Sequence, residues 1–269
     1  MPFVQPRDIR IHYFEEGDPA TAREVVVFTH GLRRSARAWQ LVQKALPDGY
    51  YSVSPDNRGS GLTDAPPREA DYSIKLFADD LFDLGTALDL PPFTLVGGSD
   101  GGATAMHFAV DHPGWVKALV LVDPTDPDGH LPTGMTVEAF VDKRTASWHR
   151  LRQSILDGQD SLVPAATPAE FRKALLNDIV TAPERRFRGA TRSMATLRIG
   201  DRVSSLPMPV LLMTGDRVPL DKTRATLAKL PEGTYLQIVH AAGHALNVEV
   251  PAETAAILQR FVERVVPAK

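Results

Sequence analysis

Short apolar runs recur along the chain, separated by longer segments in which apolar residues follow a helical period. Most of these runs are apolar at consecutive positions, and they cover residues 25–29, 51–54, 93–97, 118–122, 209–214 and 235–239. A strand of this kind is buried on both faces, as strands of a parallel sheet are. The alternation predicts an α/β fold with a mostly parallel central sheet flanked by helices.

Helix signals fall between these runs. Ser73 is a predicted N-cap for a helix whose apolar residues recur from Ile74 to Leu88. A second helix, rich in small residues, follows Gly101, and Pro251 opens a C-terminal helix with an apolar stripe. Before all of these, residues 7–14 alternate between apolar and polar, which predicts an edge strand.

The segment from about residue 125 to 200 breaks the alternation, because no run in it reads as a strand. The pattern of residues 135–156 predicts one or two helices. The stretch from Thr167 to Glu170 has the sequence of a capping box, with Pro168 at the first helical position. The sequence therefore predicts a core at residues 1–124, a helical cap at 125–202, and the rest of the core at 203–269.

Composition narrows the class of protein. The 269 residues carry a formal charge of −3 and are 43% hydrophobic, which argues against disorder and against nucleic acid as a partner. No apolar run is long enough to span a bilayer, and residues 1–10 lack the apolar stretch of a signal peptide. The absence of cysteine excludes disulfides and thiolate chemistry. We expect a cytoplasmic protein with a small-molecule substrate, no metal and no cofactor; a homodimer stays open.

The motif G-x-S-x-G at Gly97, Ser99 and Gly101 is the strongest chemical signal. A nucleophile on a tight turn between a strand and a helix has a strained backbone, and only small residues fit two positions before and after it. An apolar strand precedes this motif and a small-residue helix follows it, which is the context that the motif requires. The pattern predicts Ser99 as a nucleophile.

Two further loops follow predicted strands. His30 and Gly31 come directly after the run at residues 25–29, and the backbone N–H groups of Leu32 and Asp100 are the predicted oxyanion hole. We expect His30 to brace that loop and Gly31 to line the pocket. After the last predicted strand comes Ala-Gly-His, ending at His244, which is the predicted general base.

Together these pieces resemble the α/β-hydrolase fold superfamily over about three quarters of the chain. The matching stretches are HG at residues 30–31, DNRGSG at 56–61, GGSDGG at 97–102, LVLVDP at 119–124, TGD at 214–216 and AGH at 242–244. The resemblance implies hydrolysis by a Ser-His-acid triad without a cofactor. It also implies that the insertion is the cap that members of the superfamily carry.

The sequence departs from the common family pattern at the triad acid. Members place an aspartate three residues after Gly215, where this chain has Val218. Asp123 ends a predicted strand 24 residues after Ser99, as in the zearalenone-type lactonases and the cofactor-free quinaldine dioxygenases that it resembles. We favour Asp123 because a triad acid needs a rigid position; the alternatives are Asp126, Asp216 and Asp221.

The side chains around the site set expectations for the substrate. The carboxylate of Asp100 is interpreted as a helix cap whose charge disfavours anionic substrates. The predicted cap is mostly apolar, and Trp148 is its candidate pocket residue. An apolar cap favours a small to medium hydrophobic substrate. The arginines of residues 185–192 are interpreted as a solvated helix face, with a carboxylate-attracting pocket mouth as the alternative.

These residues predict a serine hydrolase that cleaves a carboxylic ester or lactone through an acyl-enzyme. Three alternatives remain: a C–C bond hydrolase, a cofactor-free dioxygenase or haloperoxidase on the same fold, and a slow-turnover ligand-binding protein of the receptor type. An epoxide hydrolase or haloalkane dehalogenase is disfavoured, because those mechanisms need a carboxylate where this chain has Ser99.

Overall fold

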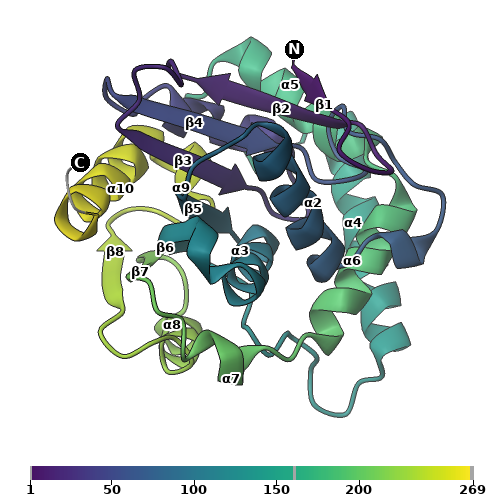
Figure 1. The fold of residues 1–269 in the computed structure, drawn as a ribbon. Coiled ribbons are helices and arrows are strands. Elements are labelled where there is room, and N and C mark those ends of the chain that lie inside the picture. Colours follow the sequence, from purple (N-terminus) through teal and green to yellow (C-terminus); the bar gives the residue numbers. More distant parts are fainter. Residues whose placement is uncertain (1, 160–161, 267–269) are drawn as a thin grey trace.

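One eight-stranded sheet forms the centre of the molecule (Figure 1). The computed structural model describes residues 2–159 and 162–266. The sheet has the order β1-β2-β4-β3-β5-β6-β7-β8, and every pairing from β4 to β8 is parallel. The strands are β1 (Phe3–Val4), β2 (Ile11–Glu16), β3 (Glu24–Thr29), β4 (Tyr50–Pro55), β5 (Phe93–Gly98), β6 (Val116–Val122), β7 (Val210–Gly215) and β8 (Tyr235–Val239).

The N-terminal edge of the sheet differs from the sequence prediction. The strand predicted at residues 7–14 begins only at Ile11, and it is not the edge, because the two-residue β1 pairs outside it. Both contacts of this edge are antiparallel, with Phe3 opposite His12 and β2 opposite β4. Since the chain must reverse direction between Val4 and Ile11, the intervening residues form the connection instead of a strand.

Helices cover both faces of the sheet. The helices and helical turns are η1 (Ala36–Trp39), α1 (Gln40–Gln43), η2 (Glu69–Asp71), α2 (Ile74–Ala87), α3 (Asp100–Asp111), η3 (Pro113–Trp115), α4 (Val137–Leu156), α5 (Ala169–Thr181), α6 (Glu184–Thr196), α7 (Gly200–Val203), α8 (Leu220–Leu227), α9 (Leu246–Glu249) and α10 (Pro251–Val265). Among the described residues, no helix is long and apolar enough to cross a membrane.

The continuous apolar strands supply two separate cores. Val27 and Leu95 pack with α2 and α3 on one face, whereas their neighbours Val26 and Val96 pack with α1 and α10 on the other. Successive strand residues point to opposite faces, so a strand buried on both sides must be apolar at every position. This confirms the α/β architecture that the sequence predicts.

The predicted helix starts are confirmed at two sites and wrong at a third. The Ser73 hydroxyl accepts a hydrogen bond from the Leu76 N–H at 3.1 Å, and Pro251 is the first residue of α10. The capping box at Thr167 does not form, because Pro168 occupies the N-cap position of α5 and no side chain caps that helix.

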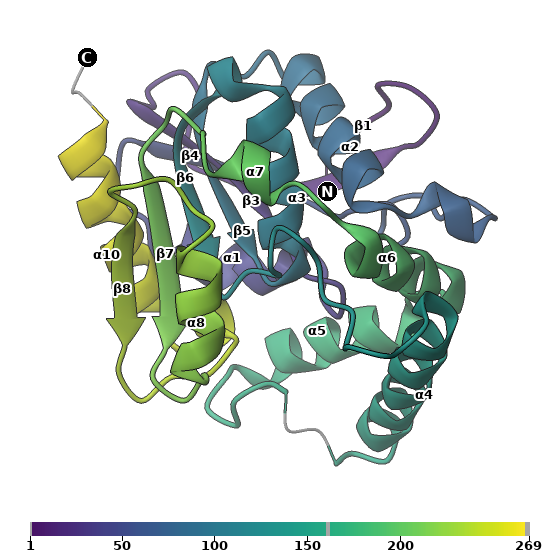
Figure 2. The same cartoon turned by 90° about the horizontal axis from the view of Figure 1, so that it is seen from below.

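A helical insertion of α4, α5 and α6 separates β6 from β7, as the sequence predicts (Figure 2). The ring of Trp148 on α4 stacks on that of Phe187 on α6, with centroids 5.2 Å apart and planes 13° from parallel. This stack joins the two helices inside the core. The insertion boundaries at residues 125 and 202 stay a prediction.

Candidate active site

Ser99 occupies a strained turn between β5 and α3. Its φ and ψ angles are 55° and −123°, a conformation that residues other than glycine rarely adopt. The close packing around it explains the two glycines. A Cβ at Gly97 would lie 2.3 Å from the Gly101 carbonyl oxygen, and a Cβ at Gly101 would lie 2.3 Å from that of Thr29. The turn directs the Ser99 hydroxyl into the pocket and sets the positive end of α3 behind it.

The three residues predicted as a triad lie together at the carboxyl ends of the strands. His244 Nε2 is 3.1 Å from Ser99 Oγ, and His244 Nδ1 is 3.2 Å from Asp123 Oδ2. Asp123 is 3% exposed, and Thr214 Oγ1 donates a hydrogen bond to its other carboxylate oxygen at 3.2 Å. Asp123 also has a positive φ of 46°, so both strand-end residues are held in uncommon backbone conformations.

The alternative acids lie in other environments. Asp126 accepts a hydrogen bond from Lys229 Nζ at 2.7 Å, and the carboxylate of Asp221 is 98% exposed. Asp216 bonds to the backbone N–H groups of Ala241 and Ala242 at 3.0 and 3.3 Å. Of the four aspartates, only Asp123 has an ion-pair contact with the His244 imidazole within 4 Å.

A carboxylate that the sequence analysis missed holds the His244 loop. Glu249 accepts hydrogen bonds from the backbone N–H groups of Gly243 at 2.8 Å and Ala245 at 3.0 Å. These bonds fix the residues on both sides of His244, whose imidazole is half exposed. The only sequence signal was an acidic residue five positions after the histidine, which is too common a pattern to single out.

His30 braces the loop after β3, as the sequence predicts. Its ring is buried; Nδ1 lies 2.8 Å from the Gly31 carbonyl oxygen, and Nε2 accepts the Asn57 N–H at 3.0 Å. Burial is the main cause that lowers the pKa of His30 to about 4, and the charge of Arg186 adds to it. The imidazole is therefore neutral near pH 7, which suits one donating and one accepting nitrogen.

Asp100 has an unexpected role in that loop. Its carboxylate does not cap α3; it accepts hydrogen bonds from Thr125 Oγ1 at 2.7 Å and from the Leu32 N–H at 3.3 Å. The Leu32 N–H is one of the two predicted oxyanion-hole donors. The other, the Asp100 N–H, belongs to the first residue of α3 and so has no partner within the helix. A substrate oxygen must compete with the Asp100 carboxylate for the Leu32 donor.

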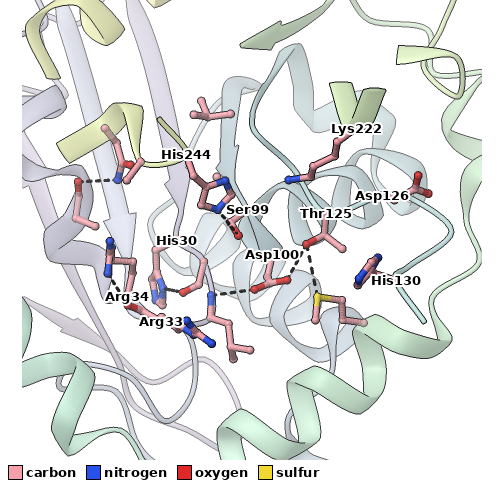
Figure 3. Close-up of a pocket in the computed structure, with 18 of the residues that line it drawn as sticks. His30, Arg33, Arg34, Ser99, Asp100, Thr125, Asp126, His130, Lys222 and His244 are labelled. Carbon is pink, nitrogen blue, oxygen red and sulfur yellow. Dashed lines mark hydrogen bonds between the residues drawn. The ribbon is translucent and has the colours of Figure 1, made fainter. Parts of the chain in front are cut away.

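The site opens into a pocket of about 640 Å³ (Figure 3). Ser99, His244 and Gly31 line it, whereas Trp148 does not, because its ring is buried in the stack between α4 and α6. The lining is also more polar than the sequence analysis expected. It includes four cationic side chains, which are Arg33, Arg34, Arg144 and Lys222.

The arginines of α6 are not a solvated face. Arg188 and Arg192 both pair with Glu69, at 2.7 and 2.5 Å, and Arg192 also pairs with Glu138 at 2.8 Å. Arg186 is 1% exposed, and its guanidinium donates a hydrogen bond to the Leu32 carbonyl oxygen at 2.5 Å. These side chains tie the insertion to the core, and none of the three lines the large pocket. Periodicity alone could not show that the polar face of α6 packs against the core.

The positions of the His, Asp and Glu side chains also bear on whether a metal ion could bind. Within residues 2–159 and 162–266, no three His, Asp or Glu side chains are grouped so that they could hold a metal ion. The chemistry that the site offers is that of a nucleophile, a base and an orienting carboxylate.

Comparison with known proteins assigns the fold to a family. A family model described as the alpha/beta hydrolase fold matches residues 24–251. The chain belongs to this family. A Caulobacter vibrioides protein named "Putative carbamate hydrolase RutD" is 26% identical, over 94% of this chain and 95% of its own length.

Two solved structures of this family's fold superpose on almost the whole chain. An esterase (EaEST) from Exiguobacterium antarcticum has a TM-score of 0.81 at 22% identity, covering 97% of this chain and 98% of its own. The enol-lactonase from Burkholderia xenovorans LB400 has a TM-score of 0.80 at 18% identity, covering 97% and 99%. At these identities the likeness shows the α/β-hydrolase fold.

Proposed function

We propose that this α/β-hydrolase is a serine hydrolase that cleaves a carboxylic ester or lactone through an acyl-enzyme. The observation that carries the proposal is the 3.1 Å contact between Ser99 Oγ and His244 Nε2, with Asp123 on the other side of the imidazole. A serine hydroxyl is a weak nucleophile until a base removes its proton, and a base works best when a third group orients it.

The reaction proceeds in two halves. Ser99 Oγ attacks the carbonyl carbon while His244 Nε2 takes its proton, and the N–H groups of Leu32 and Asp100 stabilise the oxyanion. His244 then returns the proton to the leaving oxygen as the C–O bond breaks. Water attacks the acyl-enzyme in the same way, which releases the acid and restores Ser99. Asp123 stays ionised and stabilises the imidazolium throughout.

The buried acid at the end of β6 supports the lactone branch of the proposal, since the resemblance to lactonases rests on that position. In a lactone the leaving oxygen stays attached to the acyl group, so ring opening yields one hydroxy acid and releases one proton at neutral pH. The EaEST and enol-lactonase names describe those proteins, and they are compatible with either branch.

The test is release of p-nitrophenol from short and medium acyl esters, followed by a lactone panel read as proton release. We expect Ser99→Ala to remove turnover and labelling by a fluorophosphonate probe, while Ser205→Ala, at an exposed serine, keeps both. Loss of at least about 10³-fold is the scale for a missing nucleophile. Retained turnover in Ser99→Ala with oxygen uptake would instead identify an oxygenase and contradict the proposal.

A further inference from the structure

Two arginines share the pocket with Ser99 but come from different parts of the fold. Arg33 comes directly after Leu32 in the loop that follows β3, and Arg144 lies on α4 of the insertion. We call this pair the basic wall. Both side chains are partly buried, so each positive charge has lost part of its hydration. Burying a charge is unfavourable unless a partner compensates for it.

The basic wall lacks that compensation within the part of the chain that the structure describes. Neither Arg33 nor Arg144 has a carboxylate oxygen within 4 Å in residues 2–159 and 162–266. The Nε atoms of both are buried and have no hydrogen-bond partner. Their other contacts are weak: Arg33 Nη2 lies 3.5 Å from Ser147 Oγ, and its guanidinium lies 5.8 Å from the centre of the Phe187 ring. Arg144 lies 5.9 Å from the centre of the Phe140 ring.

Charge in this part of the pocket is unbalanced. Burial first, and then the charge of Arg144, lower the pKa of the Arg33 guanidinium, while Asp100 opposes them. The Asp100 carboxylate is already occupied by Thr125 and the Leu32 N–H. Arg33 therefore lies near the positive charge of Arg144 and near one carboxylate that is already engaged and that also acts on the buried Arg186. An anion bound by Arg33 and Arg144 would relieve the repulsion between these two groups.

The other charged groups of the pocket have polar partners nearby; Arg34 donates hydrogen bonds to the carbonyl oxygens of Arg33 at 3.1 Å and Leu162 at 3.3 Å. Asp126 is paired with Lys229 at 2.7 Å, and Lys222 Nζ lies 3.9 Å from Asp123 Oδ1. Of the cationic side chains that line the pocket, Arg33 and Arg144 are those whose buried Nε atoms have no hydrogen-bond partner among the described residues. Arginine presents a planar fork of N–H donors that matches the two oxygens of a carboxylate.

We propose that the substrate carries a free carboxylate in addition to its scissile ester or lactone, and that Arg33 and Arg144 bind this carboxylate. This inference rests on the proposed ester or lactone hydrolysis and names its substrate class: half-esters of short dicarboxylic acids, or lactones that bear a carboxylate. It revises the expectation of a hydrophobic substrate, which rested on the apolar cap and on the charge of Asp100.

A matched pair of esters tests the specificity. The anionic member is the mono-p-nitrophenyl ester of glutaric acid, and the neutral member is the same compound with its carboxylate methylated. We expect wild type to have a kcat/KM at least about tenfold higher for the anionic ester. Arg144→Gln and Arg33→Gln should each reduce that ratio about tenfold, mainly through KM. Arg150→Gln, at an exposed position of α4, is the control and should keep the ratio.

A binding measurement separates this inference from the proposed function. Glutarate is titrated into Ser99→Ala, followed by tryptophan fluorescence, because Trp39 lines the pocket. We expect saturable binding that weakens about tenfold or more when Arg144→Gln is added. Hydrolysis of both esters without preference, and no glutarate binding, would overturn the carboxylate site and leave the hydrolase in place. No hydrolysis of either ester would overturn the hydrolase, and the titration alone would then decide the carboxylate site.

Discussion

The floor of the pocket and its basic wall differ in whether their polar side chains contact one another. On the floor, Ser99, His244 and Asp123 contact one another, and Thr214 donates to the Asp123 carboxylate. In the basic wall, the buried Nε atoms have no hydrogen-bond partner among the residues that the structure describes. A chain of contacting polar groups fixes geometry for chemistry, even though Asp123 Oδ2 is 3.2 Å from His244 Nδ1 without a hydrogen bond. A charge without a close partner is available to a ligand.

Two arginines of α6 show that this difference is not a property of arginine itself, whereas the buried Arg186 on the same helix also has unpartnered guanidinium nitrogens. Arg188 and Arg192 have carboxylate partners from η2 and α4, and they hold the insertion against the core. We therefore propose three roles: catalysis for the floor, substrate binding for the basic wall, and an architectural role for the paired arginines of α6. Each of these assignments has its own test.

The largest effect is expected from breaking the floor at Asp123. Asp123→Asn removes the charge that stabilises the His244 imidazolium and favours the wrong tautomer, so kcat should fall about 10³- to 10⁴-fold. Steady-state release of p-nitrophenol measures it, and the thermal midpoint should show that the variant folds. Asp221→Asn, at a fully exposed carboxylate, is the matched control. An equal loss in Asp221→Asn, on α8, would contradict the assignment of Asp123 as the triad acid.

The next effect concerns His30, whose buried ring contacts the Gly31 carbonyl oxygen in the loop beside Ser99. Its pKa is near 6.5 in an unfolded chain and about 4 in the folded protein, so the unfolded chain binds more protons between these values. Stability is therefore lost as pH falls from about 6.5 towards about 4, by an order of about 2 kcal/mol from this residue. Urea unfolding near pH 7 and pH 4.5 should show a larger loss for wild type than for His30→Gln. Equal losses in the two proteins would contradict a neutral, buried His30.

The smallest effect is expected on α6. Arg192→Gln removes ion pairs in which Arg192 and Glu69 are about a third exposed and Glu138 more so. Pairs of this kind contribute about 0–1 kcal/mol, so the free energy of unfolding should fall by less than about 1 kcal/mol. The preference between the two glutarate esters should not change. A change in that preference as large as in Arg144→Gln would erase the distinction between the basic wall and the paired arginines.

Patterns that are local in the sequence predicted most of the fold. The six apolar runs correspond to β3 through β8, because a strand buried on both faces leaves a signature within a few residues. The elbow was predictable for the same reason: the positive φ of Ser99 needs small neighbours, and Gly97 and Gly101 lie only two positions away. The prediction was wrong where a partner outside the segment decides the structure. At residues 7–14, pairing with β1 sets the start of the strand.

The sequence by itself determined which residue types stand at the ends of the strands: a serine on an elbow, a histidine after the last strand and an aspartate after β6. Only the tertiary structure decided which of four aspartates approaches His244, that Asp100 reaches the Leu32 N–H, and which arginines lack partners. The physical reason is the separation along the chain over which each effect acts. Backbone strain and burial act between neighbours in the chain, whereas the pairing of charges depends on atoms that folding brings together from elements far apart in the sequence.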